Sequence, residues 1–332
     1  MKETNRRSFL KIAGASLGIG VLYSAYPAAR GAGEAAGVFS ELGRANGEKV
    51  APFSFVQLSD AHVGFNGPPD PLGTKAFERA VEMINGLRQR PDLVLFTGDL
   101  THDTEDRDVH IQRMRQFQEI TKRINVPMIK CVPGEHDAGL DSGALYREFF
   151  GESHYSFDHR GVHFVALDNV TRAKPEVGAE QLEWLKKDLA RFPKTAPIVV
   201  FTHRPLFDLR PDWEWFTSDG DEVMNVLSAY DNLTVLYGHI HRDDEHQTGS
   251  VHHYAARSLI FAFPDPNGVT GPRKPVPFDK EHPFKNLGIR TVSFNGKSEP
   301  GSMPVSIEDV ELTAREFRGI NGVHQLLRNP IV

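Results

Sequence analysis

Residues 93–99 read LVLFTGD, a short apolar run that ends abruptly in a glycine and an aspartate. A continuous apolar run of this length is typical of a strand buried on both faces of a parallel sheet. Strand patterns also occupy 53–60 and 127–134, and helical periodicity fills 73–90 and 105–124. This order predicts parallel strands joined by helical crossovers, with polar side chains gathered at the carboxyl ends of the strands.

The second half of the chain repeats this organisation. Its predicted elements are a hairpin at 154–169, helices at 178–192 and 219–230, and strands at 197–203 and 233–241. Both of these strands end in histidines, so this half also brings polar groups to strand ends. Because the two halves supply one ordered set of polar residues, we predict a single α/β domain.

The remaining segments give weaker patterns. Strands are predicted at 251–256 (VHHYAA) and 258–264 (SLIFAFP), and a solvated turn at 241–246 (HRDDEH). Proline and glycine are frequent from 264 to 283, which predicts a long irregular loop. Two strand-like runs follow, at 287–294 and 303–312.

Composition narrows the functional classes. The 332 residues carry a net charge of −6, so the chain offers no basic platform for nucleic acid. Cys131 is the single cysteine, which excludes an intramolecular disulfide. The 15 histidines direct attention to metal binding.

The N-terminal segment has the features of a targeting signal. Arg6 and Arg7 precede Ser-Phe-Leu-Lys and a modest apolar run, an arrangement that resembles a twin-arginine export signal over 1–33. A general secretory signal and an uncleaved membrane anchor are the alternatives. Residues 34–50 are rich in glycine, alanine and glutamate and are interpreted as a linker. We therefore expect the twin-arginine translocase as a partner and a periplasmic or otherwise exported location.

Five strand ends carry side chains that commonly bind metals. They are Asp60 and His62 in LSDAHVG, Asp99 in FTGD, Glu135 and His136 in PGEHD, His203 in FTHRP, and His239 and His241 in YGHIH. Residues i and i+2 of an extended segment point the same way, so a strand entering its loop can aim both at one point. Mixed carboxylate and imidazole ligands suit Mn, Fe, Zn or Ni.

The ordered set resembles the calcineurin-like metallophosphoesterases over roughly residues 53–262. The motifs SDAHVG, TGDL, FTHRP and GHIH match that family, whereas PGEHD has Glu135 where the family has asparagine. The resemblance implies a four-layer α/β/β/α sandwich of two mixed sheets. The domain would span 51–332, with an irregular C-terminal extension from about residue 264.

The resemblance also implies a role for each ligand. Asp60, His62 and His241 would hold a first ion, Asp99 would bridge two ions, and His203, His239 and Glu135 would hold the second. Residues His136 and Asp137 would act as leaving-group acid and its orienting carboxylate. The ions would be two divalent transition metals (Mn, Fe, Zn or Ni), with ferric iron as an option in one position.

These roles imply an exported, metal-dependent phosphoesterase that attacks small phosphate mono- or diesters with a hydroxide bridging two metals. The alternatives are a non-catalytic periplasmic metal-binding protein on the same scaffold and a hydrolase acting on another bond. The His136-Asp137 pair favours catalysis, since a metal store has no use for a leaving-group acid. If Glu135 binds the second metal, its charge should favour a diester or a harder metal; otherwise it turns away and water replaces it.

Nearby residues leave further alternatives open. His102 and Asp103 are interpreted as a polar loop pair, although contact with the ligands is the alternative. Arg204 would contact either a phosphate or a surface acid. Trp213 and Trp215 would either wall a substrate cleft or cap a core edge.

Overall fold

The computed structural model describes residues 50–294 and 305–313. These residues all belong to one compact unit, Glu48–Val332. The predicted export signal and nearly all of the predicted linker lie outside the described residues. Within the described ranges, no helix combines the length and apolarity needed to cross a membrane.

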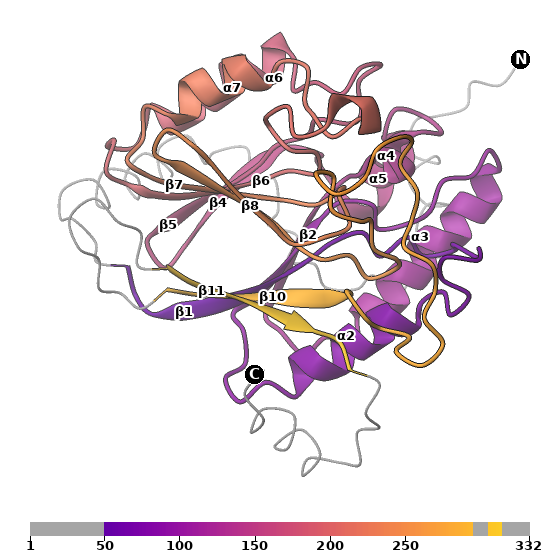
Figure 1. Ribbon diagram of the computed structural model, residues 1–332. Helices are drawn as coiled ribbons and strands as arrows, with labels where there is room; N and C mark the ends of the chain where they lie inside the picture. The colour runs from indigo at the N-terminus through magenta and orange to yellow at the C-terminus, as the bar shows by residue number, and fades with distance from the viewer. Residues whose placement is uncertain (1–49, 295–304, 314–332) are drawn as a thin grey trace, which may run out of the picture. The chain divides into compact units, whose positions relative to one another are not determined.

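Two mixed sheets form the centre of this unit (Figure 1). The first has the strand order β11-β10-β1-β2-β3, in which β1, β2 and β3 are parallel and β10 and β11 are antiparallel additions. The second has the order β4-β5-β6-β7-β9-β8, with β5, β6, β7 and β9 parallel and the outer strands antiparallel. The five strands predicted to carry the ligands, β1, β2, β3, β6 and β7, are all among these parallel strands.

The bounds of the elements follow the chain from the first strand to the last. The strands of the first sheet are β1 (Phe53–Leu58), β2 (Leu93–Thr97), β3 (Met128–Val132), β10 (Gly288–Phe294) and β11 (Val305–Glu311). Those of the second are β4 (Tyr155–His159), β5 (Val162–Ala166), β6 (Pro197–Phe201), β7 (Asn232–Tyr237), β8 (Asp244–Thr248) and β9 (Val251–Ala255). The helices are α2 (Lys75–Asn85), α3 (Arg107–Thr121), α4 (Glu135–Ala138), α5 (Ala144–Phe150), α6 (Ala179–Leu189) and α7 (Gly220–Leu227), with a short 3-10 turn, η2 (Pro211–Trp213).

Three apolar layers bind these elements together. Helices α2 and α3 pack on the outer face of the first sheet, and α6 and α7 on the outer face of the second. Phenylalanines and aliphatic residues from the facing sides of both sheets form the layer between them. The predicted four-layer α/β/β/α sandwich of two mixed sheets is therefore confirmed.

Two local predictions need correction, and two short helices were missed. Residues 258–264 are not a strand, because their backbone groups bond to loops: Leu259 N–H donates to Asp60 O, and Phe261 O accepts from the His241 ring. The predicted turn at 241–246 contains the start of β8, a charged edge strand of the kind that resists pairing with other chains. Helices α4 and α5 were not predicted. Residues 264–287 form no helix or strand, and the chain then returns to the first sheet as β10 and β11.

Candidate metal centre

All seven predicted metal ligands lie just beyond the carboxyl ends of parallel strands. Their loops bring them into two groups, within each of which the candidate ligand atoms lie no more than 4.8 Å apart. One group comprises Asp60, His62, Asp99 and His241, and the other comprises Asp99, Glu135, His203 and His239. Asp99 belongs to both, as expected of a residue that could bridge two ions.

The backbone at these residues is strained. Asp60, His62, Asp99, His239 and His241 have φ values of 54°, 41°, 48°, 67° and 52°, in the left-handed region that such residues seldom adopt. Among the described residues only nine non-glycine residues have positive φ, and these five are the majority. Each such residue costs on the order of 1–3 kcal/mol and typically occurs where function requires it. The loops are therefore built to aim these side chains.

Gly134 allows two of the loops to approach each other. A Cβ at this position would collide with the backbone nitrogen and carboxylate of Asp99. The His136 N–H donates to Asp99 Oδ1 at 3.0 Å across the same gap. The glycine before the acidic cluster thus lets the β3–α4 turn hold Asp99 in place.

All four side chains of the first group are buried. His62 Nε2 lies 3.1 Å from His241 Nε2 and 3.3 Å from Asp99 Oδ2, and His241 Nε2 lies 3.4 Å from Asp60 Oδ1. Burial lowers the pKa of His62 well below its ordinary value and that of His241 to about 3. Both imidazoles are therefore neutral and can offer a lone pair to a cation.

The second group contains the carboxylate that departs from the family pattern. Glu135 Oε1 lies 2.8 Å from His239 Nδ1, and Glu135 Oε2 lies 2.8 Å from His203 Nε2. Glu135 Oε2 and His203 Nε2 are buried, yet neither completes a hydrogen bond of good geometry. Burial raises the pKa of Glu135, but His239 and His203 outweigh it and bring it well below its ordinary value. The carboxylate points into the group, so the alternative in which it turns away does not describe this structure.

These observations fit a pair of metal ions. In the second group, Glu135 Oε2 and His203 Nε2 are buried without a hydrogen bond and are free to bind one ion. In the first group, the Nε2 atoms of His62 and His241 lie close together and could bind the other. Carboxylates with imidazoles suit Mn, Fe, Zn or Ni. Each group offers four such side chains.

In each candidate histidine ligand, the ring nitrogen that does not face the candidate metal site has a polar partner. His203 Nδ1–H donates to Thr97 O at 2.7 Å, His241 Nδ1–H to Phe261 O at 2.8 Å, and His239 Nε2–H to Glu214 O at 3.1 Å. His62 Nδ1 instead lies 3.2 Å from His102 Nδ1. A hydrogen bond at one ring nitrogen fixes which nitrogen remains for a metal.

Asp137 does not orient His136, so that prediction is wrong. Its buried carboxylate accepts hydrogen bonds from Gly134 N, Leu100 N and both the backbone and the hydroxyl of Thr101. It therefore ties the β3–α4 turn to the loop after Asp99. A peptide-bond neighbour could not fold back onto the imidazole while making these four bonds.

Asp103 is the residue that orients His136. Its Oδ1 lies 2.8 Å from His136 Nδ1. Burial lowers the pKa of His136, but the Asp99 and Asp103 carboxylates outweigh this and raise it to about 9. Asp103 thus fixes the orientation of His136, whose Nε2 lies 3.9 Å from Asp99 Oδ2. The interpretation of His102 and Asp103 as an isolated loop pair is also wrong.

Burial and contacts decide the alternatives for Arg204, Trp213 and Trp215. Arg204 is 8% exposed, and its Nη2 lies 3.4 Å from Glu135 Oε1, so it contacts an acid of the centre. Trp213 and Trp215 are buried in an apolar cluster with Tyr237 and Ile240, which makes them part of a core edge. Burying them fixes the carbonyl of Glu214 between them, which accepts from both Arg204 and His239.

Comparison with known proteins agrees with this geometry. The family model of the calcineurin-like phosphoesterases matches residues 53–243, more than half of the chain. The chain belongs to this family. A probable glycerophosphodiester phosphodiesterase, GpdQ of Arcobacter nitrofigilis, is 27% identical over 56% of this phosphoesterase and 71% of the relative. The serine/threonine-protein phosphatase CPPED1 of Mus musculus is 28% identical over 59% of this phosphoesterase and 72% of the relative.

Solved structures support the same fold for this calcineurin-like phosphoesterase. A dimetal phosphatase from Danio rerio superposes with a TM-score of 0.54 at 15% identity, covering 79% of this chain and 99% of that one. The purple acid phosphatase PPD1 from yellow lupin gives 0.57 at 15% identity, covering 80% and 52%.

Proposed function

We propose that the chain is an exported phosphoesterase that uses two divalent transition-metal ions to hydrolyse phosphate esters. Metal-dependent hydrolysis of a phosphoric ester follows from its family and from the named phosphodiesterase and phosphatase relatives. The observation that carries the two-ion proposal is the pair of ligand groups that share Asp99. A single-ion site would need only one of them.

The residues of the chain divide the work. Asp60, His62 and His241 would hold one ion, Glu135, His203 and His239 the other, and Asp99 both. When bound, such a pair of ions supplies an acidified water as nucleophile and neutralises the phosphoryl oxygens. His136, oriented by Asp103, would donate a proton or a strong hydrogen bond to the leaving oxygen.

Arg204 changes what Glu135 implies about the substrate. The additional carboxylate lowers the formal charge of the centre by about one unit relative to a neutral ligand. The guanidinium at 3.4 Å returns about one unit, so the electrostatic reason to expect a diester preference disappears. We therefore propose that both monoesters and diesters are accepted. The names of the relatives cover both kinds of ester, since they include a probable glycerophosphodiester phosphodiesterase and a protein phosphatase.

Export is proposed from the sequence alone. The Arg6-Arg7 pair and the following apolar run motivate the twin-arginine route and a periplasmic location. That route carries folded proteins, which suits an enzyme that takes up its metals before export.

The two-ion proposal is tested by Asp99→Asn. A neutral amide is a poor bridge between two cations, so we expect metal content to fall to one ion or fewer per chain and hydrolysis to be nearly abolished. Asp221→Asn, at an exposed carboxylate in the first turn of α7, serves as the matched control and should keep both ions and full activity. Metal content is measured by elemental analysis and activity with aryl phosphate mono- and diesters.

Two outcomes would contradict the proposal. Activity of Asp99→Asn within about tenfold of the parent, roughly 1.4 kcal/mol of barrier, excludes a mechanism centred on that bridge. A parent protein that binds two ions but hydrolyses none of the esters supports the alternative of a non-catalytic metal-binding protein.

A further inference from the structure

One candidate ligand is held differently from the other three. His203, His239 and His241 each donate to a backbone carbonyl, which can only accept. His62 instead meets the side chain of His102, which can also pass on a proton. For His62, the His102 side chain thus takes the role that a backbone carbonyl has for each of the other three histidines.

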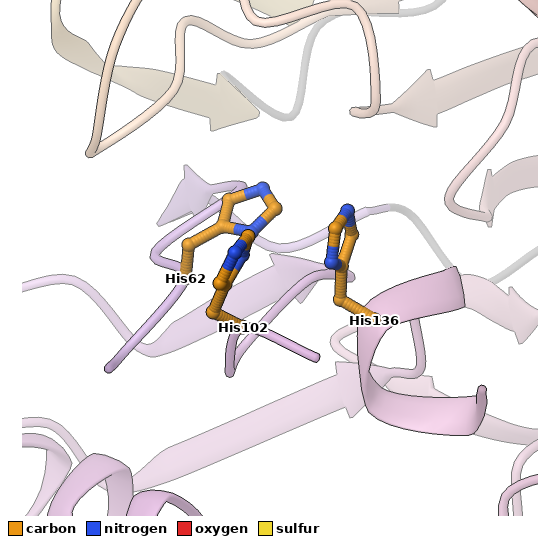
Figure 2. Close-up of side chains that lie close together, drawn as sticks. All are labelled: His62, His102 and His136. Atoms are coloured by element: carbon orange, nitrogen blue, oxygen red, sulfur yellow. The ribbon is translucent and has the colours of Figure 1, made fainter. Parts of the chain in front are cut away.

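His102 also faces the residues that hold the leaving-group acid. Its Nε2 lies 3.4 Å from Asp103 Oδ1, the same oxygen that lies 2.8 Å from His136 Nδ1. The rings of His102 and His136 are stacked, with centroids 4.8 Å apart and an interplanar angle of 20°. Figure 2 shows His102 close to His62, with His136 beside them.

The proton positions follow from this geometry. His62 Nε2 faces the first ligand group, so the proton of the neutral ring is on Nδ1 and is donated to His102 Nδ1. The proton of His102 is then on Nε2, which faces Asp103. His136 Nδ1–H donates to that carboxylate, which leaves its Nε2 directed toward the centre.

The backbone of this segment is fixed as well. Arg113, from α3, donates from Nη1 to His102 O at 3.0 Å and to Asp103 O at 2.6 Å. His102 and Asp103 are therefore presented by an anchored loop, which is what a positioning role requires.

We propose that His102 is a positioning residue that orients His62 for the first metal ion and, through Asp103, orients His136. This inference rests on the proposed function. It links the metal centre to the leaving-group acid through three consecutive contacts: His62 with His102, His102 with Asp103, and Asp103 with His136. A substitution at His102 should therefore affect both metal binding through His62 and leaving-group catalysis through His136.

A competing assignment treats His62, His102 and His136 as a metal site of their own, since their ring nitrogens lie close together. His62 would then have to offer both nitrogens to cations, because its Nε2 already faces the first group. No carboxylate belongs to this set, in contrast to the two groups that share Asp99. The hydrogen-bonded arrangement avoids both difficulties.

Two substitutions separate the two ends of the link. His102→Leu removes both nitrogens. His102→Asn places an amide oxygen near the position of Nδ1, so an acceptor for His62 remains while the group facing Asp103 is lost. His252→Leu, on β9 and outside the centre, is the control. The full-length protein is loaded with Zn²⁺ or Mn²⁺, and two quantities are measured: metal retained against a chelator, and the dependence of kcat on leaving-group pKa in a series of aryl phosphates.

We expect His102→Leu to weaken retention of one ion by about 10–100-fold, the usual effect of removing such a partner. We expect His102→Asn to retain the metal within a few-fold of the parent. Both should become more sensitive to the leaving group, as His136→Ala should, while KM changes little. The control should match the parent in both quantities.

The proposal is overturned if His102→Leu retains both ions like the parent, or if neither variant alters the leaving-group dependence. It is also overturned if the parent binds a third ion that His102→Leu loses, since the three imidazoles would then form their own site. The metal measurement does not require turnover, so a parent that hydrolyses no ester would refute the proposed function while still testing the link to His62.

Discussion

Glu135 and Arg204 form an ion pair within the candidate second metal site. The carboxylate faces His203 and His239, and the guanidinium lies 3.4 Å behind it, held by the carbonyl of Glu214. Removing one partner of a buried pair leaves the other uncompensated, which is more costly than removing both. The two residues should therefore be changed together as well as singly.

Glu135→Asn restores the asparagine of the family motif but leaves Arg204 unpaired. We expect weaker retention of the second ion, because a carboxylate is replaced by an amide oxygen. The centre also gains about one unit of positive charge, so the ratio of monoester to diester rates should rise. Chelator titration and paired kinetic assays measure these changes.

The double variant Glu135→Asn with Arg204→Gln is the matched comparison. It removes both charges, so the monoester-to-diester ratio should return toward that of the parent while metal retention stays weak. If the single variant changes neither metal retention nor the ratio, Glu135 is not a ligand.

The sequence could place the seven candidate ligands together because each follows a strand in a recognisable motif. It could not place their partners. Thr97, Glu214 and Phe261 act through backbone carbonyls, which carry no side-chain signature. Asp137 was misassigned because adjacency in sequence was taken for contact, whereas its carboxylate turns back to the backbone of the preceding loop. Spacing within GDLTHD gave Asp103 no distinguishing feature.

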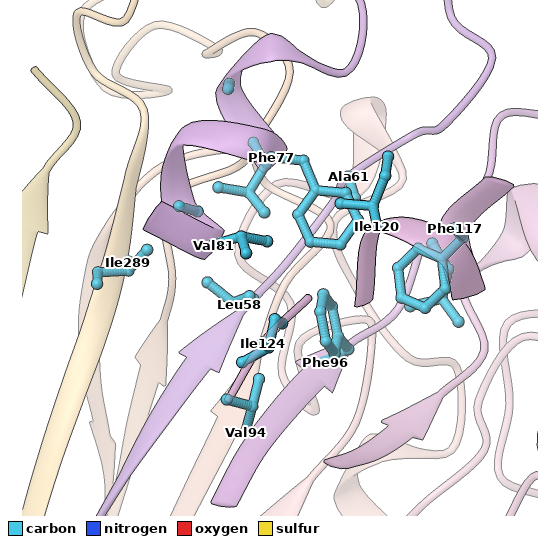
Figure 3. Packing of buried hydrophobic residues seen from close by; sticks show 14 of the residues in the cluster. Leu58, Ala61, Phe77, Val81, Val94, Phe96, Phe117, Ile120, Ile124 and Ile289 are labelled. Carbon is cyan, nitrogen blue, oxygen red and sulfur yellow. The ribbon is translucent and has the colours of Figure 1, made fainter. Parts of the chain in front are cut away.

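At the scale of elements, periodicity was a good guide to the layers. Phe77 and Val81 of α2 and Phe117 of α3 pack over Leu58 and Phe96 of the sheet below, as the amphipathic patterns predict (Figure 3). Periodicity failed in 258–264, where apolar residues are buried under the ligand loops and have no strand to pair with. A buried loop segment and a buried strand can have the same apolar sequence pattern, so the sequence alone does not distinguish them.

The turn between β3 and α4 gives a prediction about packing. Gly134 has a φ of −102°, which alanine adopts readily, so Gly134→Ala adds only a collision with Asp99. A displacement of about 1 Å at a reacting group can cost roughly 100-fold in rate, and we expect a loss of kcat/KM of that order together with weaker metal retention. Gly268→Ala is the control, because its nearest contact would be 3.7 Å away. Equal activity of the two variants would show that Gly134 does not position Asp99.

The β4–β5 hairpin and α6 share a charged cluster centred on the buried residues His163 and Asp188. His163 lies 2.7 Å from Asp158 Oδ1 through Nδ1 and 2.7 Å from Asp188 Oδ2 through Nε2, and Asp188 is also bonded to Arg191 and Ser156. Burial lowers the pKa of His163, but the two carboxylates outweigh it, so its pKa is above the ordinary value. The ring is held as an imidazolium by partners on both sides.

This cluster predicts a pH-dependent contribution to stability. Because the folded pKa lies above the unfolded value of about 6.5, the stabilisation is fully present below pH ~6.5 and is lost as pH rises through the folded pKa. His163→Gln should therefore lower the free energy of unfolding more at pH 6 than at pH 9. Denaturant unfolding at the two values measures this, with His154→Gln as control. An equal loss at both values would mean that the charge of His163 contributes nothing.

Across the described molecule, the metal centre joins the two sheets. The first sheet supplies Asp60, His62, Asp99 and Glu135, and the second supplies His203, His239 and His241. Ions bound by both sets favour the assembled sandwich over any state in which the sheets separate. Metal binding and stability of the domain should consequently rise and fall together.

The proposed export is tested by changing the two N-terminal arginines. Arg6→Lys combined with Arg7→Lys keeps the charge but removes the guanidinium pair, so we expect the protein to stay in the cytoplasm. Fractionation of cells that produce the parent and the double variant measures this. Delivery of the double variant at the parental level would exclude the twin-arginine route and favour a general secretory signal.

The pairing of β1 with β10 sets an order of events during synthesis. Phe53 of β1 pairs with Phe294 of β10. The strand before Asp60 and His62 is therefore synthesised long before the strand with which it pairs. At about 5–20 residues per second, that interval lasts on the order of tens of seconds. Throughout it one edge of β1 lacks its native neighbour and is open to other chains, and a ribosome that stops before residue 288 releases all seven candidate metal ligands without β10 and β11 of the first sheet.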